Sequence, residues 1–421
     1  MTTTLPIHDL APLGDGIHRA ERERIYVDRT LPGDVVEANI QKPSGGLVRA
    51  EVVRIIEASP HRVEAPCPSY SVCGGCTLQH ASEEFYRTWK VETVRNALRR
   101  QDVEPVTWLD PVFLPAGTRR RATFAASKEN NTVTLGYFRR RSHDVTDIAA
   151  CLVADPAIMN LRGRLAASLA PILQEGKSAD VFIQKVGEQF DVVITGPVGK
   201  KGRPDLNVYE AAAQLVEALR LSRLSWRARE RDEPEVMLER APFIARFGAL
   251  DVALPPLAFL QPTDAGEQAL VEAVMDFLPE RGAYADLFSG CGTFSGAMLT
   301  RGTVDAFEST EPAVRALEKA RGARPLRAAR RDLFRAPLAA EETKRYDAIV
   351  FDPPRAGAEE QARGLAGSPV PRVIGVSCNP ATFARDARIL ADGGYTLEAV
   401  KVIDQFIWSH HVELVASFAR R

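Results

Sequence analysis

Two short motifs near the end of the chain contain side chains that can do chemistry. Asp352 lies in Phe-Asp-Pro-Pro-Arg-Ala-Gly, and Cys378 lies in Val-Ser-Cys-Asn-Pro-Ala-Thr. Each motif follows a short apolar run that predicts a buried strand, which would put both side chains at the carboxyl edge of a parallel sheet, where ligands bind. A thiol there is a candidate nucleophile if flanking N–H groups lower its pKa. The competing interpretation is that Cys378 is a small buried apolar residue, the more common fate of a lone cysteine.

A glycine-rich segment predicts a nucleoside-binding turn. Residues 286–296 follow a predicted strand and enter a predicted helix, so their glycines let the backbone turn tightly and approach a ligand. Glu308 ends the next predicted strand, where its carboxylate can accept hydrogen bonds from ribose hydroxyls. The turn has no Gly-Lys-Ser/Thr triplet for a triphosphate, and four acids suit a sulfonium cation with an adenosine better than a pyrophosphate. These acids are Asp286, Glu308, Asp332 and Asp352. The segment therefore favours a methyl-donor cofactor.

The apolar patterns predict a multidomain α/β fold with three domains. Residues 1–60 contain short alternating strands separated by Gly and Pro, which is typical of a small β-barrel of the oligonucleotide-binding type. Residues 61–254 mix strands with helices, including one from Glu83 to Arg99, in a central α+β domain. Residues 255–421 alternate strand and helix, with a helix that starts at Asp264, and so predict a Rossmann-like, doubly wound domain.

The length and composition fit a multidomain soluble protein. The chain has 421 residues, of which 45% are hydrophobic and 26% are charged. It has no apolar run of about 18 residues, so we expect no contact with a membrane. The first residues lack a basic segment followed by an apolar one, so we expect no secretory signal and a location in the cytoplasm. Structural disulfides are then not expected, and we expect a monomer.

Basic residues gather in one part of the central region. Because the formal net charge is −1, RNA binding through overall basicity is excluded, and any RNA contact must come from a local patch. Six arginines interleaved with aromatic residues lie on either side of a turn predicted at Glu129-Asn130-Asn131. They are Arg119, Arg120, Arg121, Arg139, Arg140 and Arg141, and we predict that they contact RNA. The alternative is that they are the solvated ends of two strands.

Three segments in this order resemble the RNA 5-methyluridine methyltransferases. They are Asp-Pro-Pro-Arg-Ala-Gly, Val-Ser-Cys-Asn-Pro-Ala-Thr-Phe-Ala-Arg-Asp, and the terminal segment Trp-Ser-His-His-Val-Glu-Leu-Val at residues 408–415. The first half of the chain is similar to a TRAM barrel followed by an iron–sulfur segment, so the resemblance covers most of the chain. Members with these parts act on ribosomal RNA, so the resemblance implies 23S rRNA as the substrate and S-adenosylmethionine as the methyl donor.

The resemblance also implies roles for individual residues. Cys378 would add to carbon 6 of uracil, because carbon 5 is too poor a nucleophile to attack a methyl sulfonium directly. Glu413 would then remove the proton from carbon 5, while His411 has either a direct role or a packing and hydrogen-bonding role. The implied cofactor contacts are Gln261, Phe288, Thr293, Glu308, Asp332 and Asp352. The family usually has Asn where Thr293 stands, which puts that contact in doubt.

Four of the six cysteines are left for a metal centre, because Cys378 is the proposed nucleophile and Cys291 lies in the glycine-rich turn. Cys67, Cys73 and Cys76 lie in one short segment and Cys151 lies far downstream. Zinc sites usually contain two paired knuckles, whereas three clustered cysteines with a distant fourth fit a cubane cluster. The resemblance likewise implies a 4Fe-4S cluster held by these four residues. A zinc site and a set of reduced buried thiols are the alternatives.

Other functions stay open at this stage. A tRNA uridine-54 methyltransferase would carry the same catalytic motifs, and a catalytically inactive RNA-binding module would retain the fold. An exocyclic amino-group methyltransferase would carry an aromatic residue where Arg355 stands and would need no thiol. The sequence therefore favours an S-adenosylmethionine-dependent RNA (uracil-5-)-methyltransferase.

Overall fold

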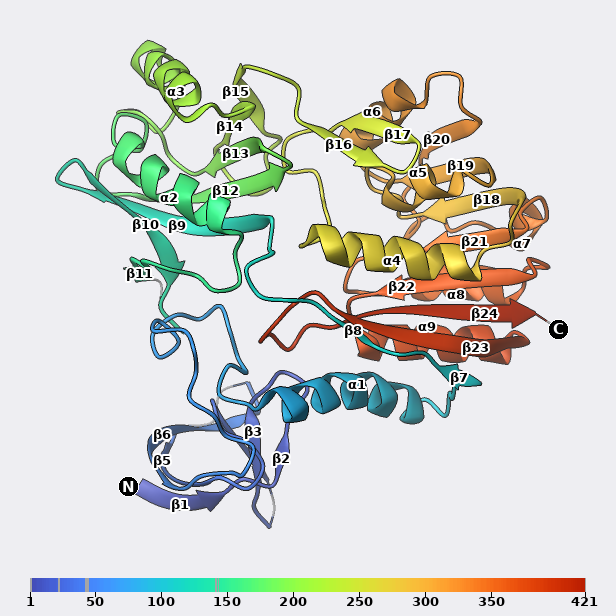
Figure 1. Cartoon of the computed structure of the whole chain (residues 1–421), viewed down its shortest axis with the longest axis horizontal. Helices are drawn as coiled ribbons and strands as arrows, with labels where there is room; N and C mark the ends of the chain where they lie inside the picture. The colour runs from blue at the N-terminus through green and yellow to red at the C-terminus, as the bar shows by residue number, and fades with distance from the viewer. Residues whose placement is uncertain (1, 22, 42–44, 141, 143, 421) are drawn as a thin grey trace.

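The protein is a multidomain α/β molecule built around three large sheets (Figure 1). The computed structural model describes residues 2–21, 23–41, 45–140, 142 and 144–420. Within these residues the chain forms a six-stranded sheet, a seven-stranded sheet, a two-stranded hairpin and a nine-stranded sheet. No helix in the described part of the chain is long and apolar enough to cross a membrane.

The N-terminal sheet surrounds a small apolar core of its own. Its strands are β1 (Thr2–Pro6), β2 (Asp9–Leu10), β3 (Gly16–Arg19), β4 (Arg24–Val27), β5 (Val35–Ile40) and β6 (Val48–Glu57), in the order β1-β5-β6-β4-β3-β2. Alternate residues of β5, such as Val36 and Ala38, point into this core. At Gly16 a Cβ atom would lie 2.0 Å from the Thr30 hydroxyl, so the tight packing requires glycine.

The central sheet carries two helices on one face. The strands are β9 (Arg121–Glu129), β10 (Thr132–Phe138), β11 (Val145–Thr146), β12 (Ser178–Val186), β13 (Gln189–Thr195), β14 (Arg223–Arg227) and β15 (Glu235–Glu239). Helices α2 (Pro156–Ser168) and α3 (Leu206–Leu219) share its core. The predicted turn joins β9 and β10, and its residues Asn130 and Asn131 have φ values of 49° and 60°, as a two-residue hairpin turn requires. The helix predicted from Asn160 begins earlier and ends before Pro171, which cannot continue a helix.

The C-terminal sheet is covered by helices on both faces. Its parallel strands are β18 (Gly282–Leu287), β19 (Gly302–Glu308), β20 (Leu326–Arg330), β21 (Ala348–Phe351) and β22 (Arg372–Ser377), followed by the antiparallel pair β23 (Tyr395–Asp404) and β24 (Glu413–Arg420). One face packs against α4 (Asp264–Phe277), α5 (Thr293–Met298) and α6 (Glu311–Arg321). The other packs against α8 (Glu359–Ala366), α9 (Pro380–Asp392) and α1 (Glu83–Arg99), with the short α7 (Ala340–Thr343) nearby. Because both faces are covered, β21 is buried throughout, as a central parallel strand should be.

Several segments of the range 61–254 belong in space to the C-terminal sheet. Helix α1 shares a core with α9 and β23, and strands β7 (Thr107–Trp108) and β8 (Val112–Phe113) pair with β23. The hairpin β16 (Ile244–Phe247) and β17 (Leu250–Ala253) packs against α5 and α6. The packing therefore divides the chain differently from the boundary predicted at residue 254. Sequence patterns reveal each element but not the sheet to which it adds.

Candidate active site

Strand β18 leads into a tight turn at the carboxyl edge of the C-terminal sheet. Phe288, Gly290 and Gly292 in this turn have positive φ values of 63°, 54° and 94°. A Cβ atom at Gly292 would lie 2.5 Å from the Leu317 side chain, so the start of α5 requires glycine. Glu308 accepts hydrogen bonds from the Gly290 N–H at 3.1 Å and the Thr310 N–H at 2.7 Å. These bonds hold the carboxylate beside the turn.

A cavity of about 390 Å³ opens at this edge and collects most of the predicted site. Phe259 and Phe334, which had not been predicted, are about half exposed and add aromatic surface to its wall. Thr293 is not among the lining residues; it is the first residue of α5. The predicted residues that line the cavity are Gln261, Phe288, Glu308, Asp332, Asp352, Cys378 and Glu413. The sequence thus identified seven residues that the fold brings to one cavity.

Cys378 and Glu413 lie opposite each other because their strands are neighbours. Cys378 directly follows β22, and Glu413 is the first residue of β24, which pairs with β22 in the antiparallel direction. The last pair in this ladder is Ser377 with Leu414, so the next positions along the two chains are residues 378 and 413. The thiol and the carboxylate therefore reach the same cavity from adjacent strands.

Burial controls the protonation of this pair. Burial, with the nearby Glu413 and Asp352 carboxylates, raises the pKa of Cys378 to about 12, while the Arg355 guanidinium acts in the opposite direction. Burial and Asp352 also raise the pKa of Glu413 well above its ordinary value. The backbone N–H at Cys378 acts to lower this pKa, in the direction suggested by the sequence, but burial outweighs it. A cation bound in the cavity would favour both ionised forms.

Gln405 links the base to a predicted cofactor residue. Its side-chain amide donates to the side-chain oxygen Oε1 of Gln261 at 2.8 Å and to Glu413 Oε1 at 3.4 Å. All three side chains are buried. This contact lowers the pKa of Glu413, although burial acts more strongly in the other direction. No motif in the sequence points to Gln405, which directly follows β23.

His411 contacts Arg355 and so has a hydrogen-bonding role. Its Nδ1 lies 3.0 Å from the Arg355 guanidinium. Burial, with smaller contributions from His410 and the Arg355 charge, lowers the pKa of His411 to about 3, so the ring is neutral and accepts this hydrogen bond. Arg355 also lines the cavity of about 390 Å³, called the cofactor cavity below, beside Cys378. His411 therefore orients the cation that favours the thiolate.

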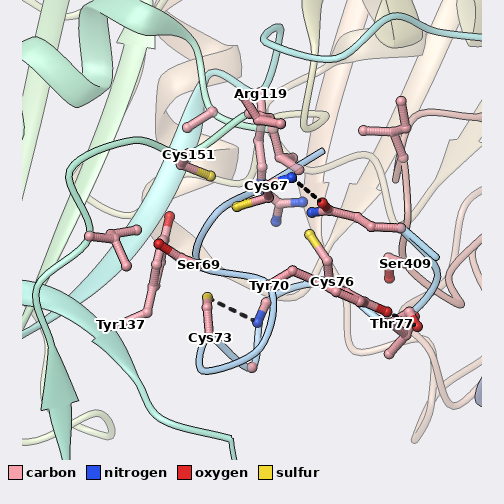
Figure 2. Close-up of a pocket in the computed structure, with 18 of the residues that line it drawn as sticks. Cys67, Ser69, Tyr70, Cys73, Cys76, Thr77, Arg119, Tyr137, Cys151 and Ser409 are labelled. Carbon is pink, nitrogen blue, oxygen red and sulfur yellow. Dashed lines mark hydrogen bonds between the residues drawn. The ribbon is translucent and has the colours of Figure 1, made fainter. Parts of the chain in front are cut away.

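The four cysteines predicted to hold a metal centre line a second cavity, of about 450 Å³. Figure 2 shows the sulfur atoms of Cys67, Cys73, Cys76 and Cys151 spread around this space, with Tyr137 and Arg119 beside them. All four are free thiols. Burial raises the pKa of Cys76 to about 12, and the pKa of Cys73 is raised for the same reason. Among the described residues, no group of three or more His, Cys, Asp or Glu side chains is arranged around a single metal ion.

The cysteine segment is attached to the loop that precedes Glu413. The N–H groups of Thr77 and Leu78 donate to the Trp408 carbonyl oxygen at 2.8 and 3.0 Å. Trp408 itself has a φ of 57°, in the left-handed region that residues other than glycine seldom adopt. His410 and His411 line the cysteine cavity as well. The cysteine cavity and the active site are therefore separated by one loop.

The predicted arginine patch is divided by the fold. Arg120 is buried, donates to the Gln261 backbone carbonyl at 2.9 Å and pairs with Asp264 and Glu267, so it is not available to RNA. The sequence could not show this, because both acids lie on α4, far along the chain. The other members have different surroundings. Arg119 lines the cysteine cavity, Arg121 stacks 4.4 Å from the Phe259 ring, Arg140 pairs with Asp28, Arg139 is exposed, and Arg141 lies outside the described residues.

Together the doubly wound sheet, the turn with Glu308 and the cavity shared by a thiol and a carboxylate define a methyltransferase of the Rossmann-like class. The family model for tRNA (uracil-5-)-methyltransferases matches residues 327–421. An RNA methyltransferase of Mesorhizobium japonicum is 38% identical over 99% of this chain and 98% of its own length. The 23S rRNA (uracil(1939)-C(5))-methyltransferase RlmD of Halomonas elongata is 32% identical over 97% of this chain and 88% of its own length.

A solved structure has the same fold. The tRNA (uracil-54, C5)-methyltransferase of Pyrococcus abyssi, in complex with S-adenosyl-L-homocysteine, matches with a TM-score of 0.73 over 100% of both chains, at 20% identity. The chain belongs to the family of S-adenosylmethionine-dependent RNA (uracil-5-)-methyltransferases. It is therefore an enzyme and not merely an RNA-binding module.

Proposed function

We propose that this enzyme methylates carbon 5 of a uridine through a covalent adduct on Cys378, with Glu413 as the base. The supporting observation is that the thiol and the carboxylate face each other across neighbouring strands in the wall of one cavity. Addition of the Cys378 thiolate to carbon 6 makes carbon 5 an enolate carbon that can act as a nucleophile. S-adenosylmethionine supplies the methyl group when it is bound in this cavity.

The second half of the reaction is assigned to Glu413. Its carboxylate takes the proton from carbon 5, the electrons of that C–H bond re-form the double bond between carbons 5 and 6, and the Cys378 sulfur leaves as a thiolate. Gln405 donates to Glu413 Oε1, which leaves Oε2 to accept the proton. Gln261, Phe288, Glu308, Asp332 and Asp352 are the proposed cofactor contacts.

Variants of the two residues test this mechanism. Cys378→Ala should abolish methyl transfer and leave S-adenosylmethionine affinity within a few fold, because the thiol bonds the base and not the cofactor. Glu413→Gln should stall after methylation and accumulate a protein–RNA adduct on denaturing gels. Glu398→Gln is the matched control for Glu413→Gln, since Glu398 lies on β23 outside the cavity lining and this variant should stay active. Methyl transfer by Cys378→Ala would refute the mechanism.

We propose 23S rRNA as the substrate. The supporting observation is that the ribosomal RNA relative from Halomonas elongata matches over nearly the full chain at 32% identity. The alternative, a tRNA uridine 54, corresponds to the Pyrococcus abyssi enzyme, which is 20% identical and shares the fold. Mapping 5-methyluridine in ribosomal and transfer RNA from a strain lacking this gene decides between them. Loss of the modification from tRNA alone would overturn the proposal.

We also propose that the cysteine cavity holds a 4Fe-4S cluster. Burial keeps the Cys73 and Cys76 thiols protonated unless a metal replaces the proton. The four cysteines line one cavity (Figure 2), and three clustered cysteines with a distant fourth fit a cubane cluster better than the two paired knuckles of a zinc site. Methyl transfer needs no electron, so the cluster would have a structural or RNA-positioning role. We also propose the assignments 1–60 (a TRAM-like RNA-binding barrel), 61–254 and 255–421 as divisions of the sequence, within which α1, β7, β8 and the β16–β17 hairpin of the second stretch pack on the C-terminal sheet.

Metal analysis tests the cluster directly. Protein purified without oxygen should be brown and contain about four irons and four sulfides for each chain, the content of one cubane. Cys73→Ser should lose iron and thermal stability together, whereas Cys291→Ser should keep its iron. One zinc ion for each chain without iron would show that the assignment is wrong.

A further inference from the structure

We propose that a groove beside Cys378 holds the RNA nucleotides next to the target uridine. The groove has a volume of about 210 Å³. Its walls come from five parts of the chain: the end of β2 with the turn after it (10–13), the second half of helix α1 with Arg100 after it, Arg355, residues 378–381, and His410 with His411. In Figure 1, helix α1 runs between the N-terminal sheet and the C-terminal sheet. This inference rests on the proposed function, because it takes Cys378 as the residue that bonds the target base.

The position of the groove indicates its occupant. Cys378 and Arg355 line both the groove and the cofactor cavity, so the two spaces meet at the thiol. A uracil with carbon 6 on Cys378 and carbon 5 toward the methyl donor lies at this junction. Its ribose and flanking phosphates need a path that the cofactor does not occupy. The groove provides such a path, so the occupant is the same RNA chain that carries the target base.

The walls of the groove have the chemistry that single-stranded RNA requires. Trp89 is half-buried and Leu13 is 58% exposed, so they offer apolar surface to bases, while Asn96 offers hydrogen-bonding groups. Arg100 is exposed and, within the described part of the chain, makes no ion pair, so its charge is available to a phosphate. Glu92 also lines the groove, but its carboxylate lies 2.9 Å from Arg95, which balances its charge.

A wider hollow of about 800 Å³ adjoins the groove, because Leu13 and His410 line both spaces. Arg49, Arg139 and Arg140 also line the hollow. Arg49 pairs with Asp15 and Arg140 with Asp28, whereas Arg139 is exposed. RNA that leaves the groove can therefore continue over the hollow, where Arg139 offers a charge to a phosphate.

Two adjacent arginines provide a matched test. Arg100 lines the groove, whereas Arg99 is not among its lining residues and pairs with Glu92 at 3.5 Å and Glu104 at 3.6 Å. The substrate is total RNA from a strain of the source organism lacking the gene, which contains the natural unmodified site. Arg100→Gln should raise KM for this RNA several-fold, leave kcat and KM for S-adenosylmethionine unchanged, and reduce the salt slope of binding by about 0.7. Arg99→Gln, which loses contacts with Glu92 and Asn96 but no groove-lining charge, should change KM and the salt slope less than Arg100→Gln does.

Cross-linking locates the bound nucleotides independently. RNA from the same strain, grown with 5-fluorouracil and 4-thiouracil, should form a covalent adduct at Cys378, and near-ultraviolet light should then cross-link neighbouring nucleotides to peptides containing residues 89–100. The inference is overturned if Arg100→Gln and Arg99→Gln have the same KM and salt slope, or if adducts form and no cross-link falls within residues 10–13 or 89–100. Failure of the wild type to form the adduct and to transfer methyl groups would instead refute the proposed function and the groove with it.

Discussion

Replacing Lys90 with methionine should destabilise the protein by about 3 to 5 kcal/mol and loosen the loop 405–412 that leads to Glu413. Lys90 lies on α1 with a side chain that is 0% exposed, and its amino group is 2.8 Å from Asp404, which is 2% exposed. The amino group also donates to the backbone carbonyls of Phe406 and His411. One buried cation thus holds both ends of the loop.

The size of the effect follows from what the substitution leaves behind. Methionine has nearly the length and volume of lysine, so a cavity contributes little. The Asp404 carboxylate would stay buried with the Tyr86 hydroxyl and the Phe406 N–H as its donors, without a compensating charge. Removing one partner of a buried ion pair costs about 3 to 5 kcal/mol for this reason. Adding Asp404→Asn should restore more than half of the loss, because it neutralises the uncompensated charge.

A second ion pair provides the control. Lys185 lies 2.8 Å from Asp155, the same distance, but these side chains are 17% and 21% exposed. Because both side chains keep some contact with water, Lys185→Met should cost less, about 1 to 2 kcal/mol. Urea unfolding measures the free energy of unfolding of each variant. Hydrogen exchange of peptides that contain residues 405–412 measures how often the loop opens. The reasoning is refuted if Lys90→Met costs no more than Lys185→Met, or if Asp404→Asn fails to rescue it.

Three further predictions concern protons and charges. Burial raises the pKa of Asp352 to about 7, so its carboxylate is more ionised at pH 8 than at pH 6, and the sulfonium cation of S-adenosylmethionine should bind more tightly at pH 8. The affinity of S-adenosylhomocysteine, whose sulfur is uncharged, should change less. An equal pH dependence of the two affinities would contradict this prediction. Burial raises the pKa of Asp286 from 3.8 to about 7, so the stability that its protonated form contributes is present below pH 4 and is lost as the pH rises through 7. Asp286→Asn should therefore flatten the dependence of the free energy of unfolding on pH between these values. Arg120→Met should lower the melting temperature and leave the salt slope of RNA binding unchanged, because Arg120 is buried against α4. Arg139→Gln should reduce the salt slope and leave the melting temperature unchanged, because Arg139 is exposed. A changed salt slope for Arg120→Met would show that Arg120 reaches RNA.

The sequence by itself determined the local features of this protein. The helix predicted from Glu83 to Arg99 has those bounds in the structure, because Ser82 caps its first turn and its apolar residues recur at helical spacing. The strand ends that carry Asp352 and Cys378 were predicted for a similar reason, since buried parallel strands are continuous apolar runs. Because the carboxyl ends of such strands share one edge, most of the cofactor cavity could be predicted as well.

The tertiary structure decided which of these parts meet and how they are charged. The sequence placed α1 in a central domain, whereas its Lys90 joins Asp404, more than 300 residues away, under the active-site loop. It placed Arg120 on an RNA surface, whereas the acids of α4 hold that side chain inside. It suggested flanking N–H groups that could lower the pKa of Cys378, whereas burial outweighs the backbone N–H and raises this pKa. Partner choice and pKa depend on burial and on contacts between distant segments, and neither is encoded in the spacing of neighbouring residues.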